Sequence, residues 1–360
     1  MRISLVEVHA DNSFSMKRFY GDVLNSLLKS NFDVNVIKTK RCNFLRHIGF
    51  PKKFVYYVES WLMASANIVL KTRRNDVLLF TDTSDAGVVN ILIIGIVRIK
   101  RLKVVTTTHD LFGVIAAKGE LSEVRLSTSG KVLQRLIAFG LSFADLNLAI
   151  SNEAVRHSEK IIPRVRTEII PIPIRIEFHS ESISLTSLPE TYATLMMQAD
   201  WRKDRFSSIS LWTKIHSIQN KLGLVIVGSP LTETENKLIQ GHESSVIHLN
   251  HLSNDLLYQV YFQSHFNIFL SKYEGFGYPI LEANFFCKPT ILYNTLHFRD
   301  IGGPGNLYID DLETTNVESL LEQLQNVNSS ALSARVKSSF SLDLFSSRLS
   351  ELVRELQDNA

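Results

Sequence analysis

The chain contains little cysteine, no long apolar segment and hardly any net charge. Only two of its 360 residues are cysteines, Cys42 and Cys287, which are too few for a disulfide framework and typical of a reducing compartment. The longest apolar run, residues 91–97, is much shorter than a membrane span. A formal net charge of +3 gives no reason to expect a nucleic-acid partner. We therefore expect a cytoplasmic protein, with residues 1–8 as a first strand rather than a signal peptide.

Patterns that bind metal ions are also scarce. No Asp-x-Asp tract occurs, and His248-x-x-His251 has no cysteine or carboxylate set that would complete a zinc site. We expect no bound metal ion and no cofactor. The negative charge of a ligand would then have to be met by cationic side chains and backbone amides.

The cations of the first half of the chain are clustered. One group comprises Lys38, Lys40, Arg41, Arg46, Lys52 and Lys53, and a second comprises Arg98, Lys100, Arg101 and Lys103. Such groups are common on solvated surfaces, but they are also typical of a patch that contacts anionic lipid. Both interpretations stay open, and peripheral membrane contact is one of our hypotheses.

Short β-rich runs alternate with helical segments up to about Ile170. This alternation predicts an α/β domain with a doubly wound, mainly parallel sheet. A first helix should bury one face formed by Tyr20, Leu24, Leu27 and Leu28. The other expected helices are 53–72, 86–98, 129–144 and 152–160. The expected strands are 3–8, 33–37, 77–80, 103–107, 146–149 and 168–170.

Pro171 and Pro173, followed by a serine-rich stretch, interrupt this pattern and indicate a linker. A second alternation then predicts a second parallel sheet. Its expected strands are 192–197, 223–227, 246–249, 266–270 and 290–293, and its expected helices are 206–218, 233–240, 254–264 and 279–287. Amphipathic helices are expected at 317–326 and 342–357. The predicted division is a domain of residues 1–172, a linker 173–189, a domain 190–340 and a C-terminal helix 341–360.

The most informative stretch follows the strand expected at 266–270 and reads Glu274-Gly275-Phe276-Gly277-Tyr278-Pro279-Ile280-Leu281-Glu282-Ala283. Its glycines permit a tight loop with exposed amides, and Pro279 suits the first position of a helix. Such a helix start attracts phosphate. Glu274 on the loop and Glu282 in the opening turn can accept hydrogen bonds from hydroxyls on either side of that phosphate. A diphosphate flanked by two polyhydroxylated rings is a nucleotide sugar.

This decamer resembles the Glu-x7-Glu motif of retaining GT-B glycosyltransferases, in particular of glycosyltransferase family 4. The resemblance implies a GT-B fold, in which two Rossmann-like domains face a central cleft and a C-terminal helix crosses back to the first domain. It implies that Glu274 contacts the donor sugar and that Glu282 contacts the ribose. It also places the nucleotide sugar on the second domain and the acceptor against the first. The loop residues implied to meet the diphosphate and sugar are Gly275, Phe276, Gly277 and Tyr278.

A basic tract at residues 201–205 follows the first strand of the second domain and opens a helix, which suits a negatively charged ligand. In the resembled family a lysine of this tract binds the donor diphosphate, and Lys203 matches it. Family members often carry an arginine on the preceding strand end, but residues 196–199 contain no cation. Either Arg202 or Arg205 takes its place, or the diphosphate has fewer contacts.

Two further candidates lie in the first domain. His109 closes a strand, where it can bond a sugar hydroxyl or a phosphate, and the resembled family carries a histidine at such a strand end near the donor sugar. The alternative is a histidine that only caps its loop. The family also has a glycine-rich first loop near the donor phosphates. Residues 11–16 contain no glycine, so the amides or hydroxyls of Ser13 and Ser15 are the candidates there.

Together these features predict a retaining, metal-independent glycosyltransferase that moves a sugar from a nucleoside diphosphate to a hydroxyl of a glycan or lipid-linked acceptor. His109, Glu274 and Lys203 are the expected catalytic residues, and the resemblance implies a setting in bacterial surface polysaccharide assembly. Two alternatives stay open. A GT-B sugar-nucleotide epimerase would work without an acceptor, and a degenerate relative would bind a nucleotide or a partner without catalysis. A dinucleotide dehydrogenase is disfavoured, because no Gly-x-Gly-x-x-Gly follows an early strand.

Overall fold

The computed structural model describes residues 2–7, 14–38, 52–121, 124–178, 188–198, 200–250 and 252–358. The chain forms two compact units. Unit 1 comprises Met1–Pro173 together with Leu342–Ala360, and unit 2 comprises Ile174–Ser341. Ser13, three of the six residues of the first basic group (Lys40, Arg41 and Arg46) and residues 179–187 of the expected linker lie outside the described residues.

Unit 1 is built on a six-stranded sheet with the strand order β2-β1-β3-β4-β5-β6, and every neighbouring pair is parallel. The prediction of a doubly wound parallel sheet is confirmed here. The inner strands carry apolar and β-branched residues that are buried on both faces, as is typical of parallel sheets, whereas the edge strands β2 and β6 are partly exposed. They are β1 (Arg2–Glu7), β2 (Asp33–Lys38), β3 (Val77–Phe80), β4 (Lys103–Thr108), β5 (Leu146–Ala149) and β6 (Arg166–Ile169).

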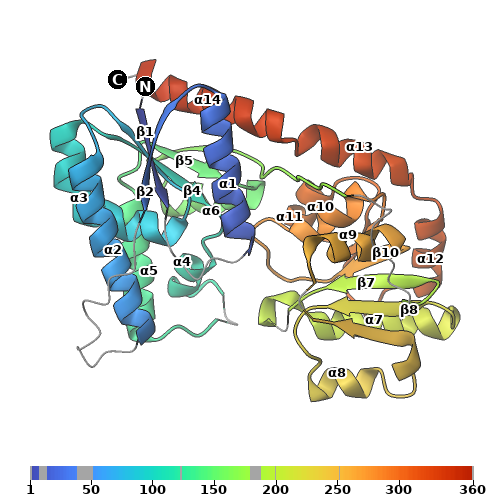
Figure 1. Cartoon of the computed structure of the whole chain (residues 1–360). Coiled ribbons are helices and arrows are strands. Elements are labelled where there is room, and N and C mark those ends of the chain that lie inside the picture. Colours follow the sequence, from blue (N-terminus) through green and yellow to red (C-terminus); the bar gives the residue numbers. More distant parts are fainter. Residues whose placement is uncertain are drawn as a thin grey trace. The chain divides into compact units, whose positions relative to one another are not determined.

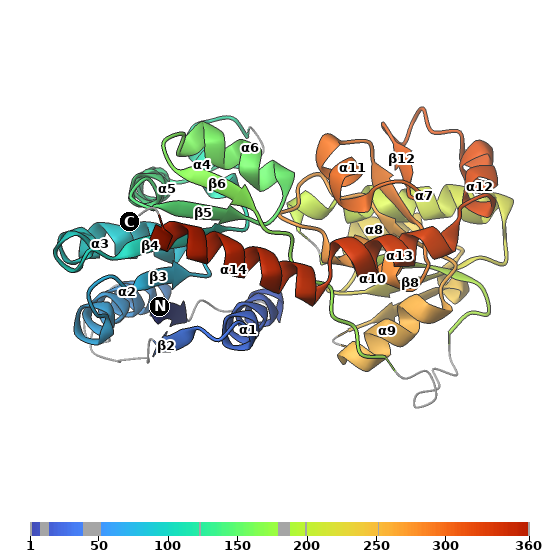
Figure 2. The same ribbon diagram turned by 90° about the horizontal axis from the view of Figure 1, so that it is seen from above.

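Helices cover both faces of this sheet. Figures 1 and 2 show α2, α3 and α5 on one face and α1 with α14 on the other. The core between the sheet and the first group includes Leu78, Phe80, Val89 and Ile137. The helices of unit 1 are α1 (Phe14–Lys29), α2 (Lys52–Lys71), α3 (Thr83–Lys100), α4 (Phe112–Ala117), α5 (Thr128–Leu141), α6 (Asn152–Ile161) and α14 (Leu342–Asp358).

The buried face of α1 differs from the expected one. Leu28 is 53% exposed, whereas Phe19, Val23 and Leu27 are buried. The prediction is confirmed for Leu27 and wrong for Leu28, and Tyr20 and Leu24 are half-buried. The helix packs on the sheet and also on α14, so that more than one face is covered. The contact with α14 includes polar pairs, in which Ser346 donates to Ser26 at 2.7 Å and Ser350 donates to Ser30 at 2.6 Å.

Unit 2 repeats this design with the strand order β12-β11-β10-β7-β8-β9, again parallel throughout. Its strands are β7 (Tyr192–Met196), β8 (Gly223–Val227), β9 (Val246–Leu249), β10 (Phe266–Phe269), β11 (Thr290–Tyr293) and β12 (Leu307–Ile309). Its helices are η1 (Trp201–Lys203), α7 (Arg205–Ile218), α8 (Glu233–Leu238), η2 (Glu243–Ser245), α9 (Asn254–Gln263), α10 (Tyr278–Phe285), α11 (Leu296–Gly302), α12 (Val317–Gln325) and α13 (Ser329–Ser339).

The strand order of unit 2 fixes where a ligand can bind. From β7 the chain adds β8 and β9 on one side and then β10, β11 and β12 on the other. The connections therefore leave the carboxyl ends of β7 and β10 in opposite directions. In open α/β sheets this topological switch point is where ligands bind. The motif around Glu274 follows β10, and the basic tract around Lys203 follows β7.

Candidate functional site

Two loops meet at the switch point of unit 2. Residues 197–204 leave β7, and residues 270–277 leave β10. The loops are tied by their backbones, because Lys272 N donates to the carbonyl of Arg202 at 2.7 Å. The hydroxyl of Ser271 donates to the same carbonyl at 3.0 Å. The basic tract and the glycine-rich motif thus form one local structure.

A charged pair lies between these loops. The ammonium of Lys203 donates a hydrogen bond to Oε1 of Glu274 and also lies 5.3 Å from the centre of the Phe269 ring. The side chains are only 19% and 11% exposed, so water screens the pair less than it would at an open surface. Two predicted site residues, from loops 71 positions apart, are therefore brought together.

The second loop ends in α10, whose start depends on Gly277. This residue has φ 105° and ψ 46°, a left-handed conformation that residues with a Cβ adopt at a cost. The helix begins at Tyr278 and ends at Phe285, whereas a helix from 279 to 287 was expected. Glu282 is consequently the fifth helical residue. The prediction that it lies in the opening turn was wrong, because Tyr278 already belongs to the helix.

Glu282 is 8% exposed and lies beside Tyr261 of α9. Burial, together with the carboxylate of Glu282, raises the pKa of the Tyr261 hydroxyl well above its usual value. Sequence reasoning missed Tyr261, because nothing in the motif around Glu274 points to a tyrosine on the preceding helix.

Two side chains of the motif have packing roles. Phe276 is buried, with its ring 5.3 Å from that of Tyr278 and 5.9 Å from that of Phe340 on the other side. Both contacts are edge-to-face, which is a favourable geometry for aromatic pairs. A ligand at this loop could therefore reach the backbone at Phe276 but not its ring.

The two arginines of the basic tract have protein partners. Arg202 pairs with Asp200 at 2.9 Å, within its own loop. Arg205 is buried and donates to both carboxylate oxygens of Glu235, to the carbonyl and hydroxyl of Ser229, and to the carbonyl of Pro230, at 2.6–3.1 Å. These bonds use all five N–H donors of its guanidinium. Arg205 therefore supports the loop at 229–230, and a contact of Arg202 or Arg205 with the donor stays a prediction.

Further residues hold the site. Asp204, which begins α7 with φ 37°, accepts a hydrogen bond from the hydroxyl of Tyr293 at 2.7 Å. This bond anchors the end of the Lys203 loop to β11, which lies on the far side of β10 from β7. Gly228, with φ 148°, closes the other side, since a Cβ there would lie 2.2 Å from the carbonyl oxygen of Met197. The glycine thus lets β8 turn tightly against the loop that carries Lys203.

His109 lies in unit 1, directly after β4. Its Nε2 lies 2.9 Å from the carbonyl oxygen of Thr81 at the end of β3. A carbonyl only accepts, so Nε2 carries a proton and Nδ1 is the acceptor of the neutral ring. Burial lowers the pKa of His109 against the opposing effects of Asp82 and Asp110. The ring is therefore a neutral acceptor suited to a hydroxyl donor.

The structure gives fewer contacts for the other predicted positions. Ser13 lies outside the described residues, and Ser15 lies in α1 without a described side chain. His248 has its Nε2 within 3.0 Å of the Gly228 carbonyl and 3.1 Å of the Ser229 carbonyl, and His251 is outside the described residues. Among the described helices none combines the length and apolar character needed to cross a membrane. Absence of a metal ion stays a prediction.

Comparisons with known proteins give a family match for unit 2 and a fold likeness for the chain. Residues 187–334 match the family model described as Glycosyl transferases group 1, a range that contains Lys203, Glu274 and Glu282. No curated protein matches the whole chain significantly. Because the family match covers less than half of the chain, it applies to unit 2.

Solved structures resemble both units together. Sucrose-phosphate synthase from Thermosynechococcus elongatus aligns with a TM-score of 0.72 at 15% identity, over 100% of both chains. The apo form of the lipopolysaccharide outer core galactosyltransferase WaaB aligns with a TM-score of 0.66 at 14% identity, over 99% of each. The pneumococcal O-GlcNAc transferase GtfA in complex with UDP and GlcNAc aligns with a TM-score of 0.58 at 14% identity, over 82% of this chain and 60% of that one.

At these identities the likeness concerns the fold, and it confirms the predicted fold class. Two Rossmann-like units with six parallel strands each match the GT-B architecture of these enzymes. Residues 187–334, within unit 2, are similar to the family described as Glycosyl transferases group 1. The protein has the GT-B fold.

Proposed function

We propose that the protein is a retaining, metal-independent glycosyltransferase that moves a sugar from a nucleoside diphosphate donor to a hydroxyl of a glycan or lipid-linked acceptor. The observation that carries this proposal is the contact between Lys203 and Glu274 at the switch point of unit 2. Glu282 stands one helical turn further on. A lysine paired with one carboxylate, with a second carboxylate on the helix that follows the loop, suits a diphosphate with a hydroxyl-rich group on either side.

The three residues have separate tasks in this proposal. Lys203 meets the diphosphate, where negative charge grows as the bond to the sugar breaks. Glu282 accepts hydrogen bonds from the ribose diol, and Glu274 accepts from hydroxyls of the donor sugar. The loop that ends at Gly277 brings the start of α10 to the diphosphate, and a helix N-terminus stabilises such an anion.

The proposed transfer needs no nucleophile from the enzyme. The bond between the anomeric carbon and the diphosphate oxygen breaks, and the acceptor oxygen forms a bond to the same face of that carbon. The acceptor proton passes to the departing diphosphate. His109, as a neutral ring with Nδ1 as acceptor, orients a hydroxyl and does not take the proton.

The proposal extends to a setting at a membrane surface in polysaccharide assembly. It is supported by the second basic group, of which Arg98 and Arg101 are exposed at the end of α3. The galactosyltransferase WaaB, a structural neighbour, is named for lipopolysaccharide outer core. Lipid-linked or membrane-bound sugars are acceptors that such a surface would favour.

A product assay tests the proposal. The purified full chain is incubated with EDTA, individual UDP, GDP and ADP sugars, and a membrane glycolipid extract, and the products are analysed by mass spectrometry and NMR. We expect one donor to yield a glycosylated lipid or glycan with retained anomeric configuration. An inverted product would contradict the retaining assignment. Sugar isomerised without an acceptor would favour the epimerase, and no product from any donor would favour a non-catalytic relative.

A further inference from the structure

Unit 1 contains a cavity of about 800 Å³ to which the proposed glycosyl transfer assigns no role. It lies where α3 ends and β4 begins. Its cationic and polar lining comes from Arg98, Arg101, Lys103, Asn75, Asn90 and Asp145. Apolar side chains, among them Ile94, Val97 and Phe143, line the remainder. The volume lies within the range of small-molecule sites.

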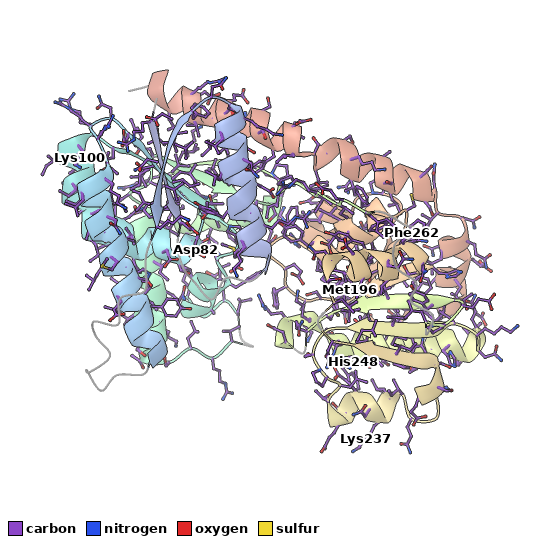
Figure 3. The ribbon with its side chains drawn as sticks, in the orientation of Figure 1. Asp82, Lys100, Met196, Lys237, His248 and Phe262 are labelled. Atoms are coloured by element: carbon purple, nitrogen blue, oxygen red, sulfur yellow. The ribbon has the colours of Figure 1, made fainter. Side chains whose placement is uncertain are left out.

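The cavity is separate from the carboxyl edge of its sheet. Lys103 is the first residue of β4, whereas His109 follows the last. The six residue steps from Lys103 to His109, at about 3.3 Å each, separate the two by roughly 20 Å. Figure 3 labels Lys100 and Asp82, which mark the cavity end and the opposite end of α3. A ligand in the cavity would therefore not occupy the site of His109.

The cations of the cavity are only partly neutralised. Lys103 lies 3.5 Å from Asp145, whose other oxygen accepts a hydrogen bond from Val104 N at 2.8 Å. Within the part of the chain that the structure describes, neither Arg98 nor Arg101 forms an ion pair. Arg98 and Arg101 stand three positions apart at the C-terminal end of α3, and Arg101, which caps the helix, has a left-handed conformation with φ 52°. Paired arginines of this kind are suited to a phosphate group.

Asn90 supplies a second, independent indication. It is 2% exposed, and its Nδ2 donates to the carbonyl of Gly140 at 3.3 Å. That bond fixes the orientation of the amide, because a carbonyl cannot donate to Oδ1. Oδ1 has no hydrogen-bond partner among the described residues. A buried acceptor without a partner is costly, so an O–H or N–H of a ligand would satisfy it.

We propose that this cavity binds an organic phosphate whose hydroxyl or amino group donates to Asn90. Arg98 and Arg101 hold the phosphate, and Ile94, Val97 and Phe143 contact the carbon skeleton. A soluble phosphate ester and the headgroup of an anionic phospholipid share this chemistry. Two exposed apolar side chains give a lipid a neighbouring apolar surface: Ile99 follows Arg98 on α3, and the ring of Phe139 on α5 lies 4.9 Å from that of Phe143.

Two binding experiments on the full chain separate the sources. Calorimetry with glycerol 3-phosphate and with inorganic phosphate tests the soluble one. Co-sedimentation with phosphatidylcholine vesicles, with and without phosphatidylglycerol, tests the lipid. The test variant is Arg98→Gln/Arg101→Gln. The matched control is Lys131→Gln/Arg135→Gln, which removes the same charge from exposed positions of α5 that do not line the cavity. Ile94→Trp fills the cavity without changing its charge.

We expect glycerol 3-phosphate to bind more tightly than inorganic phosphate, or phosphatidylglycerol vesicles to retain the protein. The Arg98/Arg101 variant and Ile94→Trp should each weaken that binding about tenfold or more, while the control stays within about twofold of the unmodified chain. Equal weakening of binding in the charge variant and its control would show that the effect depends on net charge alone, and it would overturn the proposal. Failure of both probes to bind would also overturn it.

Discussion

Lys203 and Glu274 are 71 positions apart, yet the ammonium of one donates a hydrogen bond to the carboxylate of the other. The contact joins the loops after β7 and β10, which are neighbouring strands with connections that run in opposite directions. A donor that binds here meets a lysine that is already oriented. In the proposed mechanism the ammonium of Lys203 serves both donor binding and catalysis, so its substitution should lower kcat/KM. Substitution of Glu274 should lower kcat more than donor affinity.

Lys203→Gln removes the charge that would meet the diphosphate. A charge-assisted hydrogen bond contributes about 1.5–3 kcal/mol, so we expect kcat/KM to fall about 10- to 100-fold. The assay is steady-state release of nucleoside diphosphate. Lys272→Gln is the control, since Lys272 contacts Arg202 through its backbone, and it should keep near-normal rates. A Lys203→Gln enzyme with unchanged kcat/KM would remove Lys203 from the mechanism.

Glu274→Gln keeps the size of the side chain but loses its charge. We expect kcat to fall by about tenfold or more and the donor dissociation constant to change less, because a sugar contact matters most as charge develops on the ring. Rapid-quench turnover and donor titration measure the two quantities. The account would be contradicted by a variant that loses donor affinity but turns over normally at saturation.

The buried pair of Arg205 and Glu235 should matter for stability. Its side chains are 2% and 6% exposed, so Glu235→Leu would leave an uncompensated buried guanidinium at a cost of about 3–5 kcal/mol. The double variant Arg205→Met/Glu235→Leu should be destabilised far less. Hydrogen exchange of the β7 and β8 amides reports the free energy of opening of unit 2. Equal losses in the single and double variants would show that the pair is not the cause.

The same pair gives unit 2 a pH dependence. Burial would raise the pKa of Glu235, but hydrogen bonds from Arg205 and Thr232 outweigh it and hold the pKa below its usual value. The stability that this carboxylate contributes is present above its unfolded pKa and is lost as pH falls through the lower folded pKa. Exchange measured at acid pH should therefore show a slope that the double variant lacks. An unchanged slope would assign it to other groups.

Gly277→Ala tests the turn that starts α10. With φ 105°, an alanine would cost about 1–3 kcal/mol, and its Cβ would lie 3.0 Å from Cδ1 of Ile280. We expect a lower melting temperature of unit 2 and weaker donor binding. Gly241→Ala is a control for strain alone, because Gly241 also has a positive φ of 86° but lies away from the loops of the site. Equal donor affinity in both variants would show that the turn does not shape the site.

Most of the fold could be predicted from the sequence, because the strands of a parallel sheet are mostly continuous apolar runs. The strands Val77–Phe80, Leu146–Ala149 and Gly223–Val227 have the expected bounds. The short elements α4, α11 and β12 were missed, since six, seven and three residues give too little periodicity. The roles of Arg205 and Tyr293 could not be predicted from the sequence either. Their partners Glu235 and Asp204 stand 30 and 89 positions away, and sequence alone does not show such pairs.

The most direct test of the donor site is calorimetric titration of the full chain with a panel of UDP, GDP and ADP sugars. The panel is repeated with Glu282→Ala and with Glu318→Ala, a control at an exposed position of α12 in the same unit. We predict that one nucleotide class binds, that Glu282→Ala abolishes its binding and that Glu318→Ala leaves it unchanged. Donor binding that survives Glu282→Ala intact, or no binding by any nucleotide sugar, would contradict the account.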